Sequence, residues 1–507
     1  MMSSYVSPRQ NVGLGSWPAR RARHIPNKIA WTFRGRDTSF AEVLERVDRL
    51  AAALSCVGVI PGDRVGFVGA NHPALLEVLF AVGRVGAIAV LINPRLAEHE
   101  LRYILADSGT KVLFRGPASI EAAHLIGHTE VPSLERVFNV ENELEELLTT
   151  EAFAPDVPSG WDDPCLIMYT SGTTGSPKGA VLTHGNIFFN DVNALLEADI
   201  RPDDVALAAA PMFHIAMLNG IVLPVFLKGG RSIIHESFKP DDVVSTIETE
   251  KVTSIFAVPA MMEAISQSPL FETSDITTLR TVIVGGAPAP LPMLQRWKNK
   301  GVEVQQGYGL TETSPAVLKL ASTDAERKLG SAGKGQMLVD VRIVDSNGND
   351  VGPGGTGEIL TRGPNVFPGY WNREEATASS FVDGWFKTGD IASIDDEGFI
   401  TLRDRAKDMY ISGGENVYPA EIESALLEIS GILEAAVIGV PDERWGEVGR
   451  AFVVVAPGTT HDLDSINAKL DGRLARYKLP RSVVVIETMP RNTTGKLLKQ
   501  ELREREV

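Results

Sequence analysis

The chain has 507 residues, more than one ordinary hydrophobic core accommodates, so we expect at least two domains. Its 49 Lys and Arg residues against 65 Asp and Glu residues give a net charge of −16, which argues against a broad basic face for nucleic acid. Only two cysteines occur, Cys56 and Cys165, which excludes a disulfide framework and a cysteine-rich zinc site.

Targeting segments are not recognisable in the chain. Residues 20–23 read RRAR, but the residues that follow them do not form the continuous apolar region of a secretion signal. The most membrane-like stretch, residues 75–92, contains Glu77 and Arg84, and charges inside a membrane span are costly. This stretch is better explained by a buried helix followed by a buried strand. We therefore expect a cytoplasmic protein without an integral membrane segment.

The first third of the chain alternates between helical and strand patterns. Apolar spacing predicts a helix at 40–54, a strand at 64–68, a helix at 75–82 and a strand at 87–92. Such alternation is typical of an α/β fold built on mainly parallel sheets. The segment 155–164, rich in Pro, Asp and Gly, is predicted to be a loop.

A loop rich in glycine and hydroxyl side chains follows, with the sequence YTSGTTGSPKG at residues 169–179. Its glycines allow backbone N–H groups to approach an anion closely, and Lys178 adds a positive charge. It is not a Walker A loop, because no Ser or Thr follows Lys178, and residues 180–182 continue as a strand instead of a helix. Taken alone, the loop is compatible with phosphate binding or with a surface hairpin.

The central region repeats a strand, loop and helix arrangement. Strands are predicted at 253–258, 281–284 and 302–306, with helices opening at Pro259 and near 291–298. Ligands of open α/β sheets bind beyond the carboxyl ends of such strands. The loops after these strands therefore predict a pocket.

Beyond residue 312 the pattern changes to β structure and then to a compact α+β unit. Alternating residues 339–343 and the strand at 357–361 predict a small β subdomain with a turn at Asn347 and Gly348. A helix at 420–427, strands near 435–438 and 452–455 and a helix at 466–475 follow. We place the domain junction near Asp404, which gives domains at 1–404 and 405–507.

Six motifs in order resemble the adenylate-forming enzyme superfamily, specifically the acyl-CoA synthetases of the AMP-dependent synthetase and ligase family. They are YTSGTTGSPKG at 169–179, PMFH at 211–214, QGYGLTE at 306–312, WFKTGD at 385–390, DRAKDMYISGGENVYPAEIE from Asp404, and PRNTTGK at 490–496. The resemblance implies a large N-terminal adenylation domain and a small mobile C-terminal lid. It also implies ATP, Mg²⁺ and coenzyme A as reactants, with an acyl-adenylate formed first and a CoA thioester second.

The resemblance assigns roles residue by residue. It implies that Lys496 neutralises charge during adenylation, that Thr170 and Glu312 hold Mg²⁺, that Arg405 contacts ribose and phosphate, and that His214 acts as a general base beside the acyl site. Tyr308 would stack on adenine, Asp390 would bind the ribose hydroxyls, and Lys407 would be the hinge. The other residues expected to bind nucleotide or CoA are Ser171, Gly172, Thr173, Thr174, Gly175, Lys178, Gly286, Ala287, Pro288, Gln306, Gly307, Gly309, Thr311, Gly413 and Gly414.

Other functions are compatible with parts of this pattern. A non-catalytic nucleotide-binding module is disfavoured because the acids and cations of the motifs are all present, and an amino-acid-activating domain is disfavoured because residues 212–219 contain no acid. Small uncharged residues in the stretches that resemble the acyl-pocket walls predict an apolar pocket. We expect a medium- or long-chain fatty acid as substrate, with a hydroxycinnamate such as ferulate as the alternative. If the chain assembles, we expect a homodimer.

Overall fold

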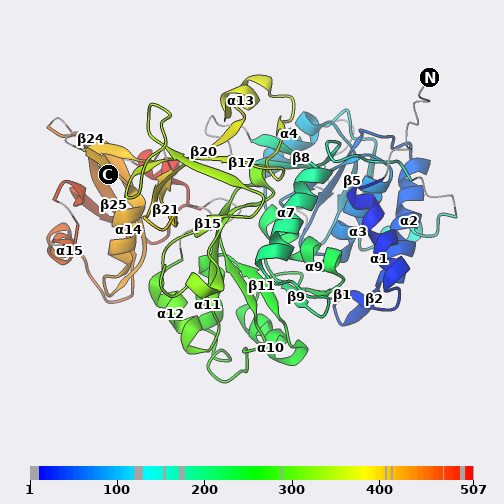
Figure 1. Ribbon diagram of the computed structural model, residues 1–507, viewed down its shortest axis with the longest axis horizontal. Coiled ribbons are helices and arrows are strands. Elements are labelled where there is room, and N and C mark those ends of the chain that lie inside the picture. The colour runs from blue at the N-terminus through cyan, green and yellow to red at the C-terminus, as the bar shows by residue number, and fades with distance from the viewer. Residues whose placement is uncertain are drawn as a thin grey trace. The chain divides into compact units, whose positions relative to one another are not determined.

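The computed structural model describes residues 11–118, 130–151, 156–170, 177–286, 289–405, 408–412, 415–442, 444–471, 473–474, 476–491 and 497–505. The chain forms two compact units (Figure 1). Unit 1 comprises residues 1–341 and 361–386, and unit 2 comprises residues 342–360 and 387–507.

The first sheet of unit 1 has seven strands. Its order is β18 (Gly369–Tyr370), β8 (Lys178–Thr183), β7 (Pro164–Thr170), β4 (Ile88–Ile92), β3 (Arg64–Val68), β5 (Thr110–Arg115) and β6 (Arg136–Asn139). The strands from β7 to β6 are parallel, whereas β8 and β18 are added antiparallel at one edge. The predicted strand at 180–182 is confirmed, and it returns alongside the strand that precedes the glycine-rich loop.

The second sheet of unit 1 has nine strands. Its order is β15 (Lys334–Gly335), β14 (Ala316–Lys319), β13 (Val304–Gly309), β12 (Thr281–Val284), β11 (Ser254–Ala257), β9 (Val205–Ala208), β10 (Arg231–Ile234), β1 (Ile29–Phe33) and β2 (Arg36–Ser39). The six strands from β13 to β1 are parallel. The carboxyl ends of β11, β12 and β13 therefore share one edge, as the sequence predicts.

Two helices of unit 1 show how local sequence sets where a helix begins and how deeply it is buried. The helix α2 (Phe40–Cys56) begins at a capping box in which Ser39 and Glu42 exchange hydrogen bonds. The helix α3 (Pro73–Arg84) is apolar nearly all round and almost entirely buried. Together with α1 (Trp17–His24), these helices lie side by side (Figure 1).

A helical layer lies between the two sheets of unit 1. The helix α7 (His184–Glu197) packs on β8, and the π-helical turn η2 (Leu218–Val222) packs on β9 and β11. The helix α9 (Leu223–Lys228) contacts both α7 and η2. Shorter or peripheral helices complete the unit: η1 (Leu14–Ser16), α4 (Glu98–Ser108), α6 (Leu144–Leu147), α8 (Ile215–Met217), α10 (Pro240–Glu250), α11 (Pro259–Ser266), α12 (Leu291–Asn299), η3 (Thr311–Thr313), η4 (Ser322–Asp324) and α13 (Glu374–Ser379).

Unit 2 contains most of a β sheet and the C-terminal α+β region. The first sheet has the order β16 (Asp340–Val344), β17 (Thr356–Arg362), β20 (Trp385–Ile394) and β19 (Phe381–Val382). The strand β21 (Ile400–Arg405) also pairs with β20. The pairing of β19 with the start of β20 lies within unit 1. The second sheet contains β23 (Glu415–Val417), β22 (Tyr410–Ser412), β25 (Gly446–Val455), β24 (Ile432–Asp442) and β26 (Ser482–Val485). Its helices are α14 (Pro419–Leu427), α15 (Leu463–Leu470), η5 (Arg476–Lys478) and α16 (Lys499–Arg503).

The predicted α/β class and the predicted elements are confirmed, with small shifts at their ends. The largest shifts are in β25, which begins at Gly446, six residues before the expected start, and in α15, which ends at Leu470, five residues before the expected end. Compactness groups residues 342–360 and 387–404 with the C-terminal region, whereas the domain junction at residues 404 and 405 stays a prediction. Among the helices of the described ranges, none combines the length and apolar character needed to cross a membrane.

Candidate functional site

The β7–β8 hairpin presents the two ends of the glycine-rich loop. Thr170 and Lys178 are antiparallel partners at the tip of the hairpin, and the Thr170 hydroxyl lies 3.5 Å from the Lys178 carbonyl oxygen. Both side chains are partly exposed. The predicted loop residues Ser171, Gly172, Thr173, Thr174 and Gly175 lie outside the described residues.

Glu312 joins this hairpin to the second sheet. It lies in η3, immediately after β13, and is only 7% exposed. The Thr170 hydroxyl donates a hydrogen bond of 3.3 Å to Glu312 Oε1, across 142 residues of sequence. The fold thus brings together the two residues expected to hold Mg²⁺. A carboxylate beside a hydroxyl is a hard oxygen donor set that suits this ion.

Tyr370 is a third member of this cluster that sequence reasoning missed. Its hydroxyl donates a hydrogen bond of 2.9 Å to the same oxygen of Glu312, and Lys178 Nζ lies 5.4 Å from the centroid of its ring. Tyr370 lies in β18, which pairs with β8 and so reaches the hairpin from a distant part of the chain. The dipeptide Gly-Tyr carries no spacing signal that predicts this contact.

The carboxyl edge of the nine-stranded sheet supplies the rest of the expected nucleotide site in unit 1. Gly286, just after β12, has a φ of +83°, which favours glycine. At Gly309, a Cβ atom would lie 1.7 Å from the Pro315 carbonyl oxygen, so only glycine permits this close approach. Tyr308 between these loops is partly exposed.

The remaining expected residues of this edge fall into three groups. Gln306 is buried, and its Oε1 accepts a hydrogen bond of 3.4 Å from the Ala289 N–H. Gly307 and Thr311 are partly exposed, at β13 and at the start of η3. Ala287 and Pro288 lie outside the described residues.

His214 precedes α8, with its ring 4.6 Å from that of Phe213. Burial and, to a smaller extent, the charge of Arg95 lower the pKa of His214 from 6.5 to about 4. The imidazole is therefore neutral at pH 7. Such a low pKa makes it a weak base, which weighs against the general-base role expected from the sequence.

A network of side chains braces the residues that flank the glycine-rich loop. Tyr169 donates a hydrogen bond of 2.7 Å to Asp107, while Tyr103 donates one of 3.1 Å to the Pro177 carbonyl oxygen. Arg373 bonds to both Asp107 and Tyr103. Burial and the hydrogen bond to Asp107 raise the pKa of Tyr169. Both ends of the loop are thus held by one network of α4 and β18-flanking residues.

Unit 2 carries the other expected site residues. Asp390 is 6% exposed and is the antiparallel partner of Arg405 in β20 and β21, with Gly389 before it at a φ of +72°. The description of Arg405 extends to its backbone alone. The predicted residues Lys407, Gly413, Gly414 and Lys496 lie outside the described residues.

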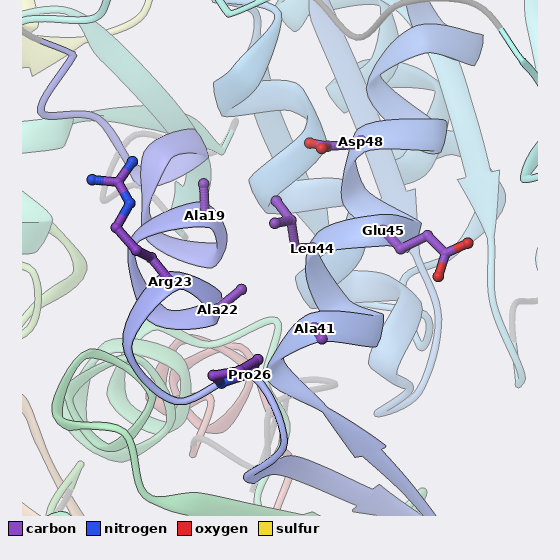
Figure 2. A pocket seen from close by; sticks show the side chains of 8 residues that line it. All are labelled: Ala19, Ala22, Arg23, Pro26, Ala41, Leu44, Glu45 and Asp48. Atoms are coloured by element: carbon purple, nitrogen blue, oxygen red, sulfur yellow. The ribbon is translucent and has the colours of Figure 1, made fainter.

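A separate groove of about 550 Å³ lies between α1 and α2 (Figure 2). Figure 2 shows the Arg23 side chain on one side of the groove and the Glu45 and Asp48 carboxylates on the α2 side. None of its lining residues belongs to the expected nucleotide or acyl site.

Comparison with known proteins identifies the family. The family model for AMP-binding enzymes matches residues 18–371, and the model for the AMP-binding enzyme C-terminal domain matches residues 421–496. The chain is 48% identical to a feruloyl-CoA synthase of Amycolatopsis, over 98% of this chain and 99% of the relative. It is 40% identical to an indoleacetate–CoA ligase of Aromatoleum aromaticum (97% and 98% covered) and to the long-chain-fatty-acid–CoA ligase FadD13 of Mycobacterium tuberculosis (98% and 98%).

A solved structure supports the same assignment. The o-succinylbenzoate coenzyme A synthetase of Bacillus subtilis, in complex with ATP and magnesium ion, superposes with a TM-score of 0.87 at 34% identity, covering 96% of this chain and 99% of that chain. The cluster of Thr170, Glu312 and Lys178 fits such a ligand set, with oxygen donors for the ion and a cation for phosphate. The chain therefore belongs to the AMP-binding enzyme family of adenylate-forming enzymes, as an AMP-forming acid–thiol ligase that uses ATP, Mg²⁺ and coenzyme A.

Proposed function

We propose that this ligase converts a hydroxycinnamate, with ferulate as the reference substrate, into its CoA thioester. The observation that carries the proposal is the 48% identity to a feruloyl-CoA synthase over nearly the whole of both chains. The identity to a fatty-acid ligase is lower, 40%, and a relative at the same 40% acts on indoleacetate, another aromatic acid. This ranking favours the alternative substrate over the fatty acid expected from the sequence.

The reaction that we propose has two balanced steps. A carboxylate oxygen of the acid attacks the α-phosphorus of ATP, and pyrophosphate leaves with the bonding electrons of the broken P–O bond. The CoA sulfur then attacks the acyl carbon, and AMP leaves while the thiol proton passes to solvent or to a phosphate oxygen. Bound Mg²⁺ would neutralise phosphate charge, held by Thr170 and Glu312.

The described residues support a division of labour in this scheme. The substrate carboxylic acid is already ionised at pH 7, so adenylation needs no base. We propose that His214, with its pKa near 4, shapes the acyl site in its neutral form and does not deprotonate the thiol. Lys178 would contact the ATP phosphates from the tip of the hairpin, and Tyr308 would lie against the adenine.

We propose that the C-terminal residues complete the site from a mobile domain beginning at residue 405. In this scheme Asp390 and Arg405 bind the ribose, Lys407 is the hinge, and Lys496 neutralises charge as the adenylate forms. A Lys496→Ala variant should lose ferulate-dependent pyrophosphate release at least about 100-fold, the scale of losing one preorganised charge partner, while ATP affinity changes far less. Unchanged pyrophosphate release would remove Lys496 from this role.

A panel of carboxylic acids tests the substrate. Ferulate, p-coumarate, indoleacetate, octanoate, palmitate and malonate are each incubated with ATP, Mg²⁺ and CoA, and thioesters are quantified by mass spectrometry. We expect kcat/KM for ferulate to exceed that for octanoate and palmitate at least about tenfold, the selectivity that one or two extra contacts supply. A preference for either fatty acid would restore the expectation from the sequence. Thioester formation without ATP would contradict the adenylate route.

Two further properties are proposed and are tested independently of the chemistry. We propose that the enzyme acts in the cytoplasm, to be checked by fractionating cells that express a tagged chain. We also propose a homodimer, to be checked by sedimentation equilibrium. A monomer at all concentrations would contradict the second proposal.

A further inference from the structure

Glu312 receives its protein hydrogen bonds on a single carboxylate oxygen. The Tyr370 hydroxyl donates to Oε1 over 2.9 Å, and the Thr170 hydroxyl donates to the same atom over 3.3 Å. In the described ranges of the chain, no hydrogen bond is formed by Oε2. Because an ionised carboxylate can accept on both oxygens, this arrangement fixes the group through one oxygen and leaves the other for an external ligand.

The same tyrosine also contacts the neighbouring cation. Lys178 Nζ lies over the Tyr370 ring, 5.4 Å from its centroid, a distance at which the ring face attracts an ammonium group. Across the described part of the chain, no salt bridge joins Lys178 to Glu312. Tyr370 therefore contacts the cation through its ring and the anion through its hydroxyl, and both charged groups keep partners other than each other.

The position of Tyr370 is fixed from three sides. It is the antiparallel partner of Ala180 in the β18–β8 ladder, and its N–H donates a hydrogen bond of 2.9 Å to the Thr377 hydroxyl. Its ring packs edge to face on Phe367, with centroids 4.9 Å apart. The Phe367 N–H in turn donates a hydrogen bond of 2.9 Å to the Glu312 carbonyl oxygen. Backbone and ring contacts thus hold the hydroxyl toward Glu312.

We propose that Tyr370 is a positioning residue of the magnesium–ATP site, which orients the free oxygen of Glu312 toward the metal and prevents a Lys178–Glu312 ion pair. The inference rests on the proposed roles of Glu312 and Lys178. An ion pair between them would neutralise the carboxylate that the metal needs and the ammonium that the phosphates need. The neutral Tyr370 side chain contacts both groups, the ammonium through its ring and the carboxylate through its hydroxyl, and cancels neither charge.

The first test is a Tyr370→Phe variant, which removes the hydroxyl and retains the ring. Binding of α,β-methylene-ATP, which cannot be cleaved at the α-phosphate, is measured by calorimetry with Mg²⁺ and with EDTA. We expect roughly 10-fold weaker binding with Mg²⁺, the usual effect of losing a partner that orients a metal ligand, and unchanged binding in EDTA. Tyr477→Phe, at an exposed tyrosine outside the site, is the matched control and should bind as the unmodified enzyme does.

A Glu312→Gln variant separates failure of this inference from failure of the proposed site. If Glu312→Gln loses the metal-dependent component of binding and Tyr370→Phe does not, the positioning role is refuted while the metal site stands. If neither variant alters the metal dependence, the assignment of Glu312 itself is refuted. Equal weakening by Tyr370→Phe with and without metal would show a general structural role and would also refute the inference.

A Tyr370→Leu variant tests the separation of charges. With the ring removed, Lys178 loses its aromatic partner and is free to approach Glu312. We expect metal-free nucleotide binding to weaken about threefold, the scale of one cation–π contact, in addition to the metal-dependent loss. Adding Glu312→Gln to Tyr370→Leu should restore the metal-free binding, because the competing anion is gone. Identical metal-free affinities for the Phe and Leu variants would refute this part.

Discussion

His184 makes a sharp prediction about how stability depends on pH. The side chain is 2% exposed at the start of α7, and its Nδ1 accepts a hydrogen bond of 3.1 Å from the Leu14 N–H. Burial lowers its pKa from 6.5 to about 4, against a smaller opposing effect of the Asp163 charge. The ring is thus neutral in the folded enzyme, and protonation of Nδ1 would also remove the hydrogen bond.

The sign and size of the effect follow from these two pKa values. Below pH 6.5 the unfolded chain binds a proton at His184 that the folded chain does not, so stability is present above pH 6.5 and is lost as the pH falls toward 4. The contribution of this one group to the free energy of unfolding falls by about 2 kcal/mol between about pH 7.5 and pH 5. At about pH 4 the loss reaches about 3 kcal/mol.

The assay compares the free energy of unfolding at about pH 7.5 with that at about pH 5, measured by urea unfolding followed by tryptophan fluorescence. In a His184→Asn variant the amide oxygen retains an acceptor for the Leu14 N–H but does not titrate. The variant should therefore lose about 2 kcal/mol of the difference between about pH 7.5 and pH 5, whatever its absolute stability. His99→Asn, at an exposed histidine, is the control and should keep the full difference. Equal pH sensitivity in both variants would refute the reasoning.

Three more outcomes follow from the contacts described. Because the pKa of His214 is about 4, substitution to Phe should leave the pH–rate profile between about pH 6 and pH 8 unchanged in shape; a lost inflection would contradict this. Gly309→Ala should abolish ATP–pyrophosphate exchange, because the added Cβ atom would overlap the Pro315 carbonyl oxygen. Gly220→Ala is the control: its added Cβ atom would meet nothing within 4 Å, so this variant should remain folded and active. Arg46→Met should lower the free energy of unfolding by about 3 kcal/mol, because the buried Glu77 carboxylate loses its ion-pair partner at 2.6 Å. Adding Glu77→Leu removes the unpaired charge and should restore most of the lost stability; urea unfolding measures both variants.

The elements of the fold were predictable because their patterns are local. The apolar spacing of residues 40–54 predicts α2, and the apolar residues of 75–82 predict most of α3. The end of α15 was not predictable in this way. Its apolar period continues past Leu470, but the backbone leaves the helix there, where Asp471 is extended with a ψ of 134°.

The site was only partly predictable, because several of its contacts connect distant parts of the chain. Thr170 and Glu312 could be expected to share a ligand from their motifs, and the structure places them 3.3 Å apart. Tyr370 could not, since its role depends on a two-residue strand that pairs with β8. The low pKa of His214 could not be predicted either, because the residues that bury its imidazole are not identified by the sequence next to His214.

The place of β1 in the nine-stranded sheet has a consequence for the order in which the protein is made. Trp31 pairs with Ser232, a separation of 232 − 31 = 201 residues, so β1 and β2 leave the ribosome long before their neighbour β10 exists. The strands β3 to β8, from residues 64–183, can assemble during this interval. The edge of β1 that pairs with β10 therefore stays unpaired until residues 231–234 have been synthesised, and an unpaired strand edge in an incomplete chain is prone to aggregation.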